Sequence, residues 1–375
     1  MKIDAARVAL VVALLLSFHS GFPTPAHVAF FIGIGILLAI ATRRSVGAAT
    51  VLVLLVGGIA IRLAVSDRTG SDVLSVTKVA IDRVLAGLDP YGYDYQSSFP
   101  PGAPFPYGPV AILAYMPFHH VAWLLELISA TVVSLILAVQ GRLLGLAVYA
   151  AMPIVVSTAV DGSNDTTLGL LIFLAFLVAA RWPMVGGLIL AVATAFKLSA
   201  FAFVPGYLAW AGLRVGLVFA AGSLVAWAPV VTTWGITSYL ASVRQANDLH
   251  GTTVTWSFGV LVKGLTGARQ EILEQLRYGV GAVIAFLGLR YRKTLDGVIV
   301  VVLVYLVTLY GGNWGSYAYL GGIAPLVCWR LDDWLGVERL PVAARLAGRV
   351  PLFARLRAAS SRVLDRYAPG YARAD

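Results

Sequence analysis

The sequence contains little charge and almost no cysteine. Only 12% of its 375 residues are Asp, Glu, Lys or Arg, whereas 59% are hydrophobic and the mean hydropathy is +0.85. A water-soluble domain of this size would aggregate with such a composition, so a soluble enzyme is excluded. The single cysteine, Cys328, cannot form an intramolecular disulfide and says nothing about the redox compartment.

Several chemical motifs are also absent. The sequence has no Walker motif, dinucleotide-binding glycine fingerprint or serine-hydrolase elbow, so nucleotide and serine-hydrolase chemistry have no support. The five histidines show no metal-ligand spacing, and we expect neither a metal site nor a cofactor, although metal dependence stays open. The net charge of +10 comes from basic residues at the ends of apolar runs and near the C-terminus. It predicts contact with anionic lipids rather than nucleic acid.

Long apolar runs are what the sequence has in abundance. They approach the roughly 20 residues that a helix needs to cross a bilayer, and in lipid the backbone must satisfy its own hydrogen bonds. We therefore predict an all-α polytopic membrane protein of about twelve transmembrane helices. Basic residues flank the runs on one side, which places both termini in the cytoplasm by the positive-inside rule. The predicted spans are 5–22, 27–42, 46–64, 119–139, 143–160, 166–180, 184–197, 198–212, 215–231, 276–290, 296–312 and 317–330.

The predicted topology divides the chain into a transmembrane domain, residues 1–330, and a basic tail, residues 331–375. The tail has the composition of an amphipathic helix that lies on the cytoplasmic leaflet. Two extracytoplasmic segments, 65–118 and 232–275, are too long to be simple turns, and long loops often carry function. In the first of them Ser71 can cap a helix with separate apolar and polar faces, which predicts a helix lying on the membrane surface.

Asp72 lies at the start of this surface helix, where a carboxylate would face the boundary between lipid and water. A general base needs such access. The alternative is that Asp72 only complements the positive end of the helix dipole. The segment that follows, residues 87–109, is dense in proline, glycine and aromatic residues, which predicts a stiff wall with stacking surfaces for sugars or lipid headgroups. Its candidate substrate-binding residues are Asp89, Tyr91 and Tyr107.

Two further polar features interrupt the apolar runs. The turn from Asp161 to Asp165 could bind a sugar hydroxyl or a cation, but it fits equally well an ordinary Asx turn in which Asn164 or Asp165 caps the next helix. Lys197 divides one long apolar run, so the span count changes if that run is a single broken helix. A lysine at such a position costs about 2.5–3.5 kcal/mol unless it snorkels or meets a counter-charge such as a phosphate. Other outward-facing candidates are Arg244, Asn247, Asp248, His250, Asn313, Trp314, Tyr317 and Tyr319.

At these residues the chain resembles the GT-C glycosyltransferases, particularly glycosyltransferase family 87. The resemblance covers about residues 65–210 and departs from the family at Ser163, where a histidine often stands, and after Asp72, where an aromatic residue often follows. Three motifs carry it: Asp72 with Leu85-Ala-Gly-Leu-Asp-Pro-Tyr91 and Pro104-Phe-Pro-Tyr-Gly-Pro109 leading to Met116-Pro-Phe118; Gly162-Ser-Asn-Asp165; and Leu190-Ala-Val-Ala-Thr-Ala-Phe-Lys197 leading to Pro205.

The resemblance implies an inverting transfer of a sugar from a polyprenyl-phosphate donor to a lipid or glycan acceptor on the extracytoplasmic side. Asp72 would take the proton from the acceptor hydroxyl, while Lys197 and Arg244 would neutralise the departing phosphate. Mannose is the sugar that the resemblance favours, with arabinofuranose next. The residues expected to contact substrate are Asp89, Tyr91, Tyr107, Asn164, Asp165, His250, Asn313 and Tyr317.

Two other classes of function fit the composition. A transporter or a flippase for lipid-linked sugars would also have about twelve spans and a lysine within the membrane. A catalytically inactive membrane scaffold is the third alternative. The long outer segment with an acidic start and an aromatic wall favours the enzyme, because a carrier does not need it.

Overall fold

The computed structural model of the chain describes residues 4–18, 25–41, 47–66, 71–98, 101–250, 257–267, 269–312 and 315–337. Residues 338–375, which make up most of the predicted cytoplasmic tail, lie outside this part. Within the described residues the regular structure is helical, and the only β-type pairing is an isolated bridge between Tyr95 and Ala103. The predicted all-α fold class is confirmed.

The chain forms two compact units built from interleaved segments, a division that the sequence analysis does not predict. The first unit contains the described residues of Met1–Gly70, Trp123–Leu170 and the chain from Leu320 on; the second contains those of Ser71–Ala122 and Leu171–Tyr319. Helix α9, Asp165–Ala179, contributes residues to both units.

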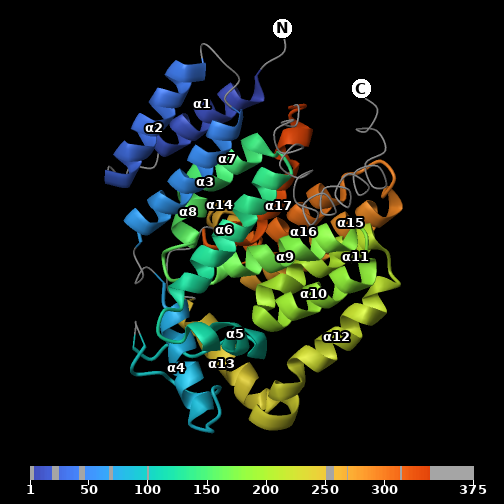
Figure 1. The fold of residues 1–375 in the computed structure, drawn as a ribbon. Coiled ribbons are helices and arrows are strands. Elements are labelled where there is room, and N and C mark those ends of the chain that lie inside the picture. Colours follow the sequence, from blue (N-terminus) through green and yellow to red (C-terminus); the bar gives the residue numbers. More distant parts are fainter. Residues whose placement is uncertain are drawn as a thin grey trace. The chain divides into compact units, whose positions relative to one another are not determined.

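The first unit packs its helices around small and apolar side chains. Helix α3 contacts α2, α6, α7 and α8, and α1 lies against α7 (Figure 1). Helix α17 approaches α7 closely, because a Cβ on Gly145 would lie only 1.8 Å from the carbonyl oxygen of Cys328. Its helices are α1 (Ala5–Phe18), α2 (Pro25–Ala41), α3 (Gly47–Ala64), α6 (Trp123–Val139), α7 (Leu143–Ala151), α8 (Pro153–Thr158), the start of α9 and α17 (Tyr319–Trp334).

The second unit contains the helices of both predicted outer segments. Helices α10 and α12 run side by side, and α15 packs closely on α16 (Figure 1). Its helices are the remainder of α9, α4 (Val73–Leu85), α5 (Pro109–Tyr115), η1 (Met116–Phe118), α10 (Pro183–Phe196), η2 (Leu198–Phe203), α11 (Val204–Ala211), α12 (Val215–Pro229), η3 (Val230–Trp234), α13 (Ile236–His250), α14 (Phe258–Thr266), α15 (Gln270–Arg290) and α16 (Gly297–Tyr310).

Helices long and apolar enough to cross a membrane are fewer than the sequence analysis predicts. Among the described residues there are two, α3 and the continuous helix Val215–Trp234 formed by α12 and η3, or three if Pro109–Phe118 and Trp123–Val139 form one span. Every predicted span coincides with helix, but many of these helices contain only 14 to 17 residues. At 1.5 Å per residue they reach about 21–26 Å, short of a hydrocarbon core of about 30 Å. The twelve-span count is not confirmed.

The predicted span 143–160 is not one continuous helix, and that expectation is wrong. Met152 is extended, with φ −67° and ψ 123°, because the following Pro153 disfavours a helical residue before it. Pro153 also has no N–H to give the carbonyl oxygen of Tyr149. The Arg62 guanidinium replaces that donor: one Nη donates to Tyr149 O at 2.7 Å, and the other donates to Ala150 O at 3.3 Å.

Candidate functional site

Helix α4 forms where the sequence predicts a surface helix. Its buried face consists of Val73, Leu74, Val76, Thr77, Ala80 and Ile81, while Lys78 and Asp82 are exposed. Asp72 is the N-cap residue and is half-buried, although its side chain makes no capping hydrogen bond. The hydroxyl of Ser71 instead accepts a long hydrogen bond of 3.4 Å from the N–H of Val73. The amphipathic helix is therefore confirmed, with Asp72 at its N-terminus.

The aromatic wall begins with a turn that Asp89 stabilises. The Asp89 carboxylate accepts a hydrogen bond of 2.8 Å from the N–H of Tyr91, and its carbonyl oxygen accepts one of 2.7 Å from Arg83 Nε. The Arg83 guanidinium also lies over the ring of Tyr93, 3.8 Å from the ring centroid. Asp89, a predicted substrate-binding residue, thus has a local structural role in this turn.

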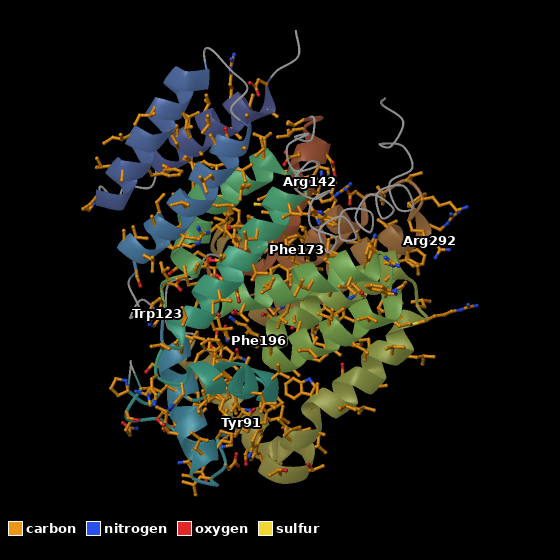
Figure 2. The ribbon with its side chains drawn as sticks, viewed as in Figure 1. Tyr91, Trp123, Arg142, Phe173, Phe196 and Arg292 are labelled. Atoms are coloured by element: carbon orange, nitrogen blue, oxygen red, sulfur yellow. The ribbon has the colours of Figure 1, made fainter. Side chains whose placement is uncertain are left out.

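Tyr91 is the centre of an aromatic cluster and is completely buried (Figure 2). Its ring lies 5.7 Å from Phe105, 5.8 Å from Trp234 and 5.1 Å from Tyr239, measured between centroids. Its hydroxyl donates to the carbonyl oxygen of Tyr107 at 3.1 Å. Burial raises the pKa of both Tyr91 and Tyr239. Tyr91 therefore supports the wall from within, whereas the sequence analysis expects it to offer an open stacking surface.

The two predicted outer segments fold together in the second unit. The N–H of Gly92, in the first segment, donates to the hydroxyl of Ser242 on α13 at 2.8 Å. The Tyr239 ring, also on α13, packs edge-on against both Tyr91 and Trp227, with 5.1 Å between centroids in each case. Each segment thus supplies part of the other's core. This pairing spans 150 residues and has no local signal in the sequence.

Gly108 joins the end of the wall to helix α10. Its N–H donates to the carbonyl oxygen of Phe196 at 3.3 Å, and a Cβ at this position would lie 2.0 Å from the carbonyl oxygen of Ala195. Only glycine permits this approach of two backbones. Helix α5 begins at the next residue and packs against α10, where the ring centroids of Tyr115 and Phe196 lie 6.0 Å apart. The wall and the end of α10 are therefore fixed against each other.

Lys197 lies at the break between two helices that the sequence predicts at this position. Helix α10 ends at Phe196, and Lys197 is extended, with φ −148° and ψ 130°, before η2 begins. The side chain is only 8% exposed, and its Nζ lies 5.6 Å from the ring centroid of Tyr107 and 5.5 Å from that of Tyr319. These distances are within the range of cation–π attraction. A cation at a helix C-terminus is also stabilised by the helix dipole.

Helix α5 connects the two charged residues of the proposed chemistry. It packs against α4, which begins after Asp72, and against α10, which ends before Lys197. Asp72, Tyr107, Lys197 and Tyr319 all belong to the second unit. The arrangement brings a cation and two aromatic rings together after α10, and it places a carboxylate at the start of α4, on the other helix that packs on α5.

The remaining predicted residues of the second unit are more dispersed. Arg244 is exposed on α13, and His250 is the last residue of that helix. Tyr317 is half-buried in the segment between α16 and α17. Asn313 and Trp314 lie outside the described residues. The roles of these residues in binding stay predictions.

Asn164 and Asp165 belong to the first unit and are buried, with 0% and 1% exposure. An Asx turn is present here: the carboxylate of Asp161 accepts a hydrogen bond of 2.8 Å from the N–H of Ser163. Capping of α9 by Asn164 or Asp165 stays a prediction. Glu126 on α6 is not among the predicted residues, although its carboxylate accepts hydrogen bonds from the N–H of Thr167 at 3.0 Å and from the Thr167 hydroxyl. The sequence feature that indicates this residue is a charged side chain inside an apolar run.

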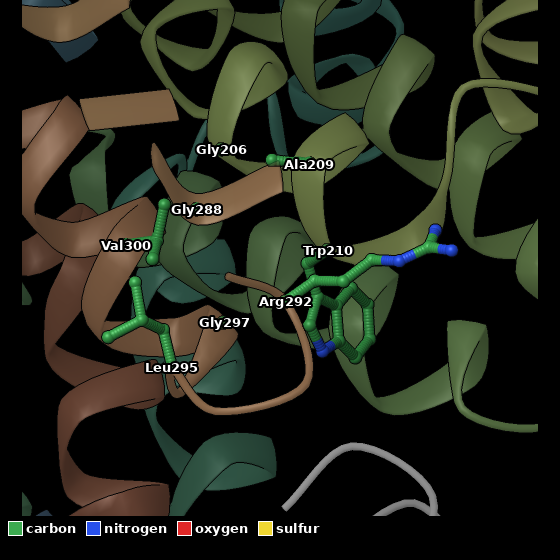
Figure 3. A pocket seen from close by; sticks show the side chains of 8 residues that line it. All are labelled: Gly206, Ala209, Trp210, Gly288, Arg292, Leu295, Gly297 and Val300. Atoms are coloured by element: carbon green, nitrogen blue, oxygen red, sulfur yellow. The ribbon is translucent and has the colours of Figure 1, made fainter. Parts of the chain in front are cut away.

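A small pocket lies elsewhere in the second unit, among α11, α15 and α16 (Figure 3). Glycines form much of its wall, and Figure 3 shows the Arg292 side chain extending past the indole of Trp210. None of the predicted site residues that the structure describes is among those lining it, which are Gly206, Ala209, Trp210, Gly288, Arg292, Leu295, Gly297 and Val300.

Comparisons with protein-family models, with curated proteins and with solved structures find no match to this chain. The resemblance to the GT-C glycosyltransferases therefore rests on the sequence motifs alone.

Proposed function

We propose that the protein is a multi-pass membrane glycosyltransferase that transfers a sugar from a polyprenyl-phosphate donor to a lipid or glycan acceptor. The observation that carries the proposal is the position of Lys197, a buried ammonium at a helix end between the rings of Tyr107 and Tyr319. A cation held by rings suits a phosphate leaving group, because phosphate needs charge neutralisation rather than a general acid. Aromatic rings also suit the apolar faces of sugars.

In the proposed reaction Asp72 acts as the general base. It accepts the proton of the acceptor hydroxyl as that oxygen bonds to the anomeric carbon, and the bond from this carbon to the phosphate oxygen breaks. The polyprenyl phosphate leaves with the electron pair, and Lys197 and Arg244 stabilise its negative charge. Support comes from the second unit, in which α5 packs on both α4 and α10. Mannose is the proposed sugar and arabinofuranose the next choice.

The proposal includes twelve spans, cytoplasmic termini and an extracytoplasmic site in the cell membrane. Helices of 14 to 17 residues can serve as spans if flanking residues extend them or the bilayer thins locally. The polar loops between Gly87 and Pro109 then face the acceptor, while the donor's isoprenoid tail stays in lipid. Anionic lipids contact the basic cytoplasmic residues.

The test is transfer of labelled mannose from synthetic polyprenyl-phosphate mannose to endogenous lipid acceptors in vesicles that contain the protein. We expect transfer by the wild type and none by Asp72→Asn, which keeps the shape of the side chain and removes its basicity. The matched control is Asp82→Asn, a carboxylate change on the same helix, which should keep wild-type turnover. Equal turnover by wild type and Asp72→Asn would eliminate the assigned base.

Lys197→Met tests the phosphate role separately. This variant should weaken use of the donor more than use of the acceptor, because only the donor carries the phosphate. An unchanged apparent affinity for the donor would contradict the role of Lys197.

One observation favours the transporter alternative. The helices α7 and α8 are separated at Met152, and α10 and η2 at Lys197, and discontinuous helices often form the substrate sites of transporters. A transporter would move the lipid-linked sugar across the vesicle membrane without covalent change. Protection of the label from an external glycosidase, with no transfer by the wild type from either donor, would support that function instead.

A further inference from the structure

The short helix α14 is mostly apolar, and the part of the chain that the structure describes leaves it almost entirely uncovered. Its exposed side chains include Phe258 at 66%, Leu261 at 57% and Leu265 at 78%. Together with Val262 they recur at i, i+3, i+4 and i+7, so they share one face of the helix. Of the nine residues of α14 only Gly259 is buried. An apolar surface of this kind is unfavourable in water and requires a cover.

The beginning of α14 is fixed to the end of α16. The Ser257 hydroxyl lies within hydrogen-bonding distance of the carbonyl oxygens of Tyr310 and Gly312 and also accepts from the N–H of Val260 at 3.3 Å. A Cβ on Gly259 would lie 2.2 Å from the carbonyl oxygen of Gly312, so the two backbones touch. The N-terminus of α14 therefore lies at the level at which α16 ends.

That level has the residues typical of a membrane boundary. Arg277 on α15 donates to Thr308 O near the end of α16, and its guanidinium lies 4.7 Å from the ring centroid of the exposed Tyr278. Before Arg277 the helix α15 carries Glu271 and Glu274, whereas the twelve residues from Tyr278 to Leu289 carry no charge. Tyrosine and arginine side chains at such a transition mark the interface between hydrocarbon and water.

Helix α14 is too short to cross a bilayer, because nine residues are only about 14 Å long. Its neighbour α13 in the same predicted outer segment is polar and packs Tyr239 and Ser242 against the aromatic wall. Helix α14 has the opposite character, and it contacts α15, whose exposed apolar side chains include Val283 and Phe286.

We propose that α14 is an in-plane anchor that lies in the outer leaflet of the membrane, with the face of Phe258, Leu261 and Leu265 among the lipids. Helices of this kind enter the boundary between headgroups and acyl chains to about 5–10 Å. The Gly267 turn that follows, with φ +66°, lets the chain leave this plane and enter α15. The inference rests on the proposed membrane topology and does not depend on sugar transfer.

The test uses a fluorescent label whose emission depends on polarity, attached to a cysteine introduced by Leu265→Cys in vesicles of phosphatidylcholine and phosphatidylglycerol. Leu265 is 78% exposed, so the substitution removes little packing, and the native Cys328 is buried. We expect emission at shorter wavelength than for a label introduced by Lys78→Cys on the polar face of α4. Nitroxide lipids labelled near the headgroup should quench it more strongly than lipids labelled deep in the acyl chain.

A label introduced by Leu303→Cys on α16 distinguishes failure of the anchor from failure of the membrane topology, because Leu303 is 44% exposed on a predicted span. If lipid nitroxides quench this label but not the one at residue 265, the anchor proposal is overturned while the topology stands. If they quench neither label, the topology fails and the anchor fails with it. Protection of residue 265 from aqueous iodide, without lipid quenching and with cross-linking between copies, would assign the surface to a second copy and overturn the anchor.

Discussion

In the first unit two buried carboxylates, those of Glu126 and Asp332, meet helix N-termini, whereas in the second unit the buried ammonium of Lys197 meets aromatic rings. Glu126 accepts from the N–H of Thr167 in the first turn of α9. Asp332 accepts from the N–H groups of Leu144 and Gly145 at the start of α7, at 3.1 and 2.9 Å. Such bonds satisfy a carboxylate completely and fix two helices together.

Ring faces act differently on a cation. They attract it through their quadrupole, and they do not neutralise it as a carboxylate would. In the proposed function the Lys197 ammonium neutralises the departing phosphate of the donor. The buried charges of Glu126 and Asp332 thus maintain the fold of the first unit, whereas the proposed function assigns the charge of Lys197 to the donor phosphate.

Asp333→Asn should have the largest effect, and it should be an effect on stability. Asp333 pairs with both Arg142 (Figure 2) and Arg330, which are 1% and 3% exposed. Removing the carboxylate leaves two guanidinium groups buried, which costs about 3–5 kcal/mol. Thermal unfolding in detergent, followed by the loss of monodisperse protein, measures the change. Asp296→Asn, at the N-cap of α16, should be nearly neutral because asparagine is also a good cap.

Gly108→Ala should have the second-largest effect, which should be on the stability of the second unit and on use of the donor. The added Cβ would displace the wall from the carbonyl oxygen of Ala195, at a cost of about 1–3 kcal/mol. We expect a lower thermal midpoint and a loss of donor use that exceeds the loss of folded protein. The control is Gly264→Ala, because nothing lies within 4 Å of a Cβ at that position. Equal behaviour of the two variants would contradict the close approach at Gly108.

Tyr319→Leu should weaken donor binding and leave stability nearly unchanged. The ring attracts Lys197 with an energy of about 0.5–2 kcal/mol, which corresponds to roughly a 2- to 30-fold rise in the apparent KM for the donor. Tyr319→Phe keeps a ring and should stay close to the wild type. If the leucine variant lost stability but kept its KM for the donor, the Tyr319 ring would have a structural role, like the buried carboxylates of the first unit.

The smallest effect concerns pH. Burial raises the pKa of Tyr91 and Tyr239 in the folded protein above the value of about 10 for an exposed tyrosine. The stability that these neutral hydroxyls contribute is complete below about pH 10 and is lost as the pH rises further, because the unfolded chain then ionises first. Thermal unfolding at increasing pH should show this loss. Tyr91→Phe should reduce the alkaline loss, while Tyr93→Phe, at an exposed ring, should not.

Much of the fold follows from local patterns. The helix positions, the amphipathic α4, the Asx turn after Asp161 and the break at Lys197 are all predictable, because hydrophobic period, capping and an isolated charge act within a few residues. Pro153 is a similar local signal for a break, because a proline disfavours a helical residue before it, but the predicted span 143–160 runs through it. The twelve-span topology and the catalytic assignments stay predictions.

The rest depends on contacts between distant residues. Tyr91 belongs to an aromatic segment that predicts an exposed wall, and only Tyr239 and Trp234, from the second outer segment, make it a core residue. The role of Arg62 depends on the carbonyl oxygens of α7 that lose their helical N–H donor at the Pro153 break. No pattern within one segment contains these partners, so the site cannot be completed from the sequence alone.

The bond between Gly92 and Ser242 also determines when the site can form during synthesis. Their separation of 150 residues means that the aromatic wall is made long before α13, the helix that covers it. In the proposed topology the wall reaches the extracytoplasmic side first, and Tyr91 stays uncovered there while the intervening helices enter the membrane. Maturation of the site is therefore a late event, and a truncated chain that ends before α13 should be recognised by envelope proteases through this uncovered aromatic surface.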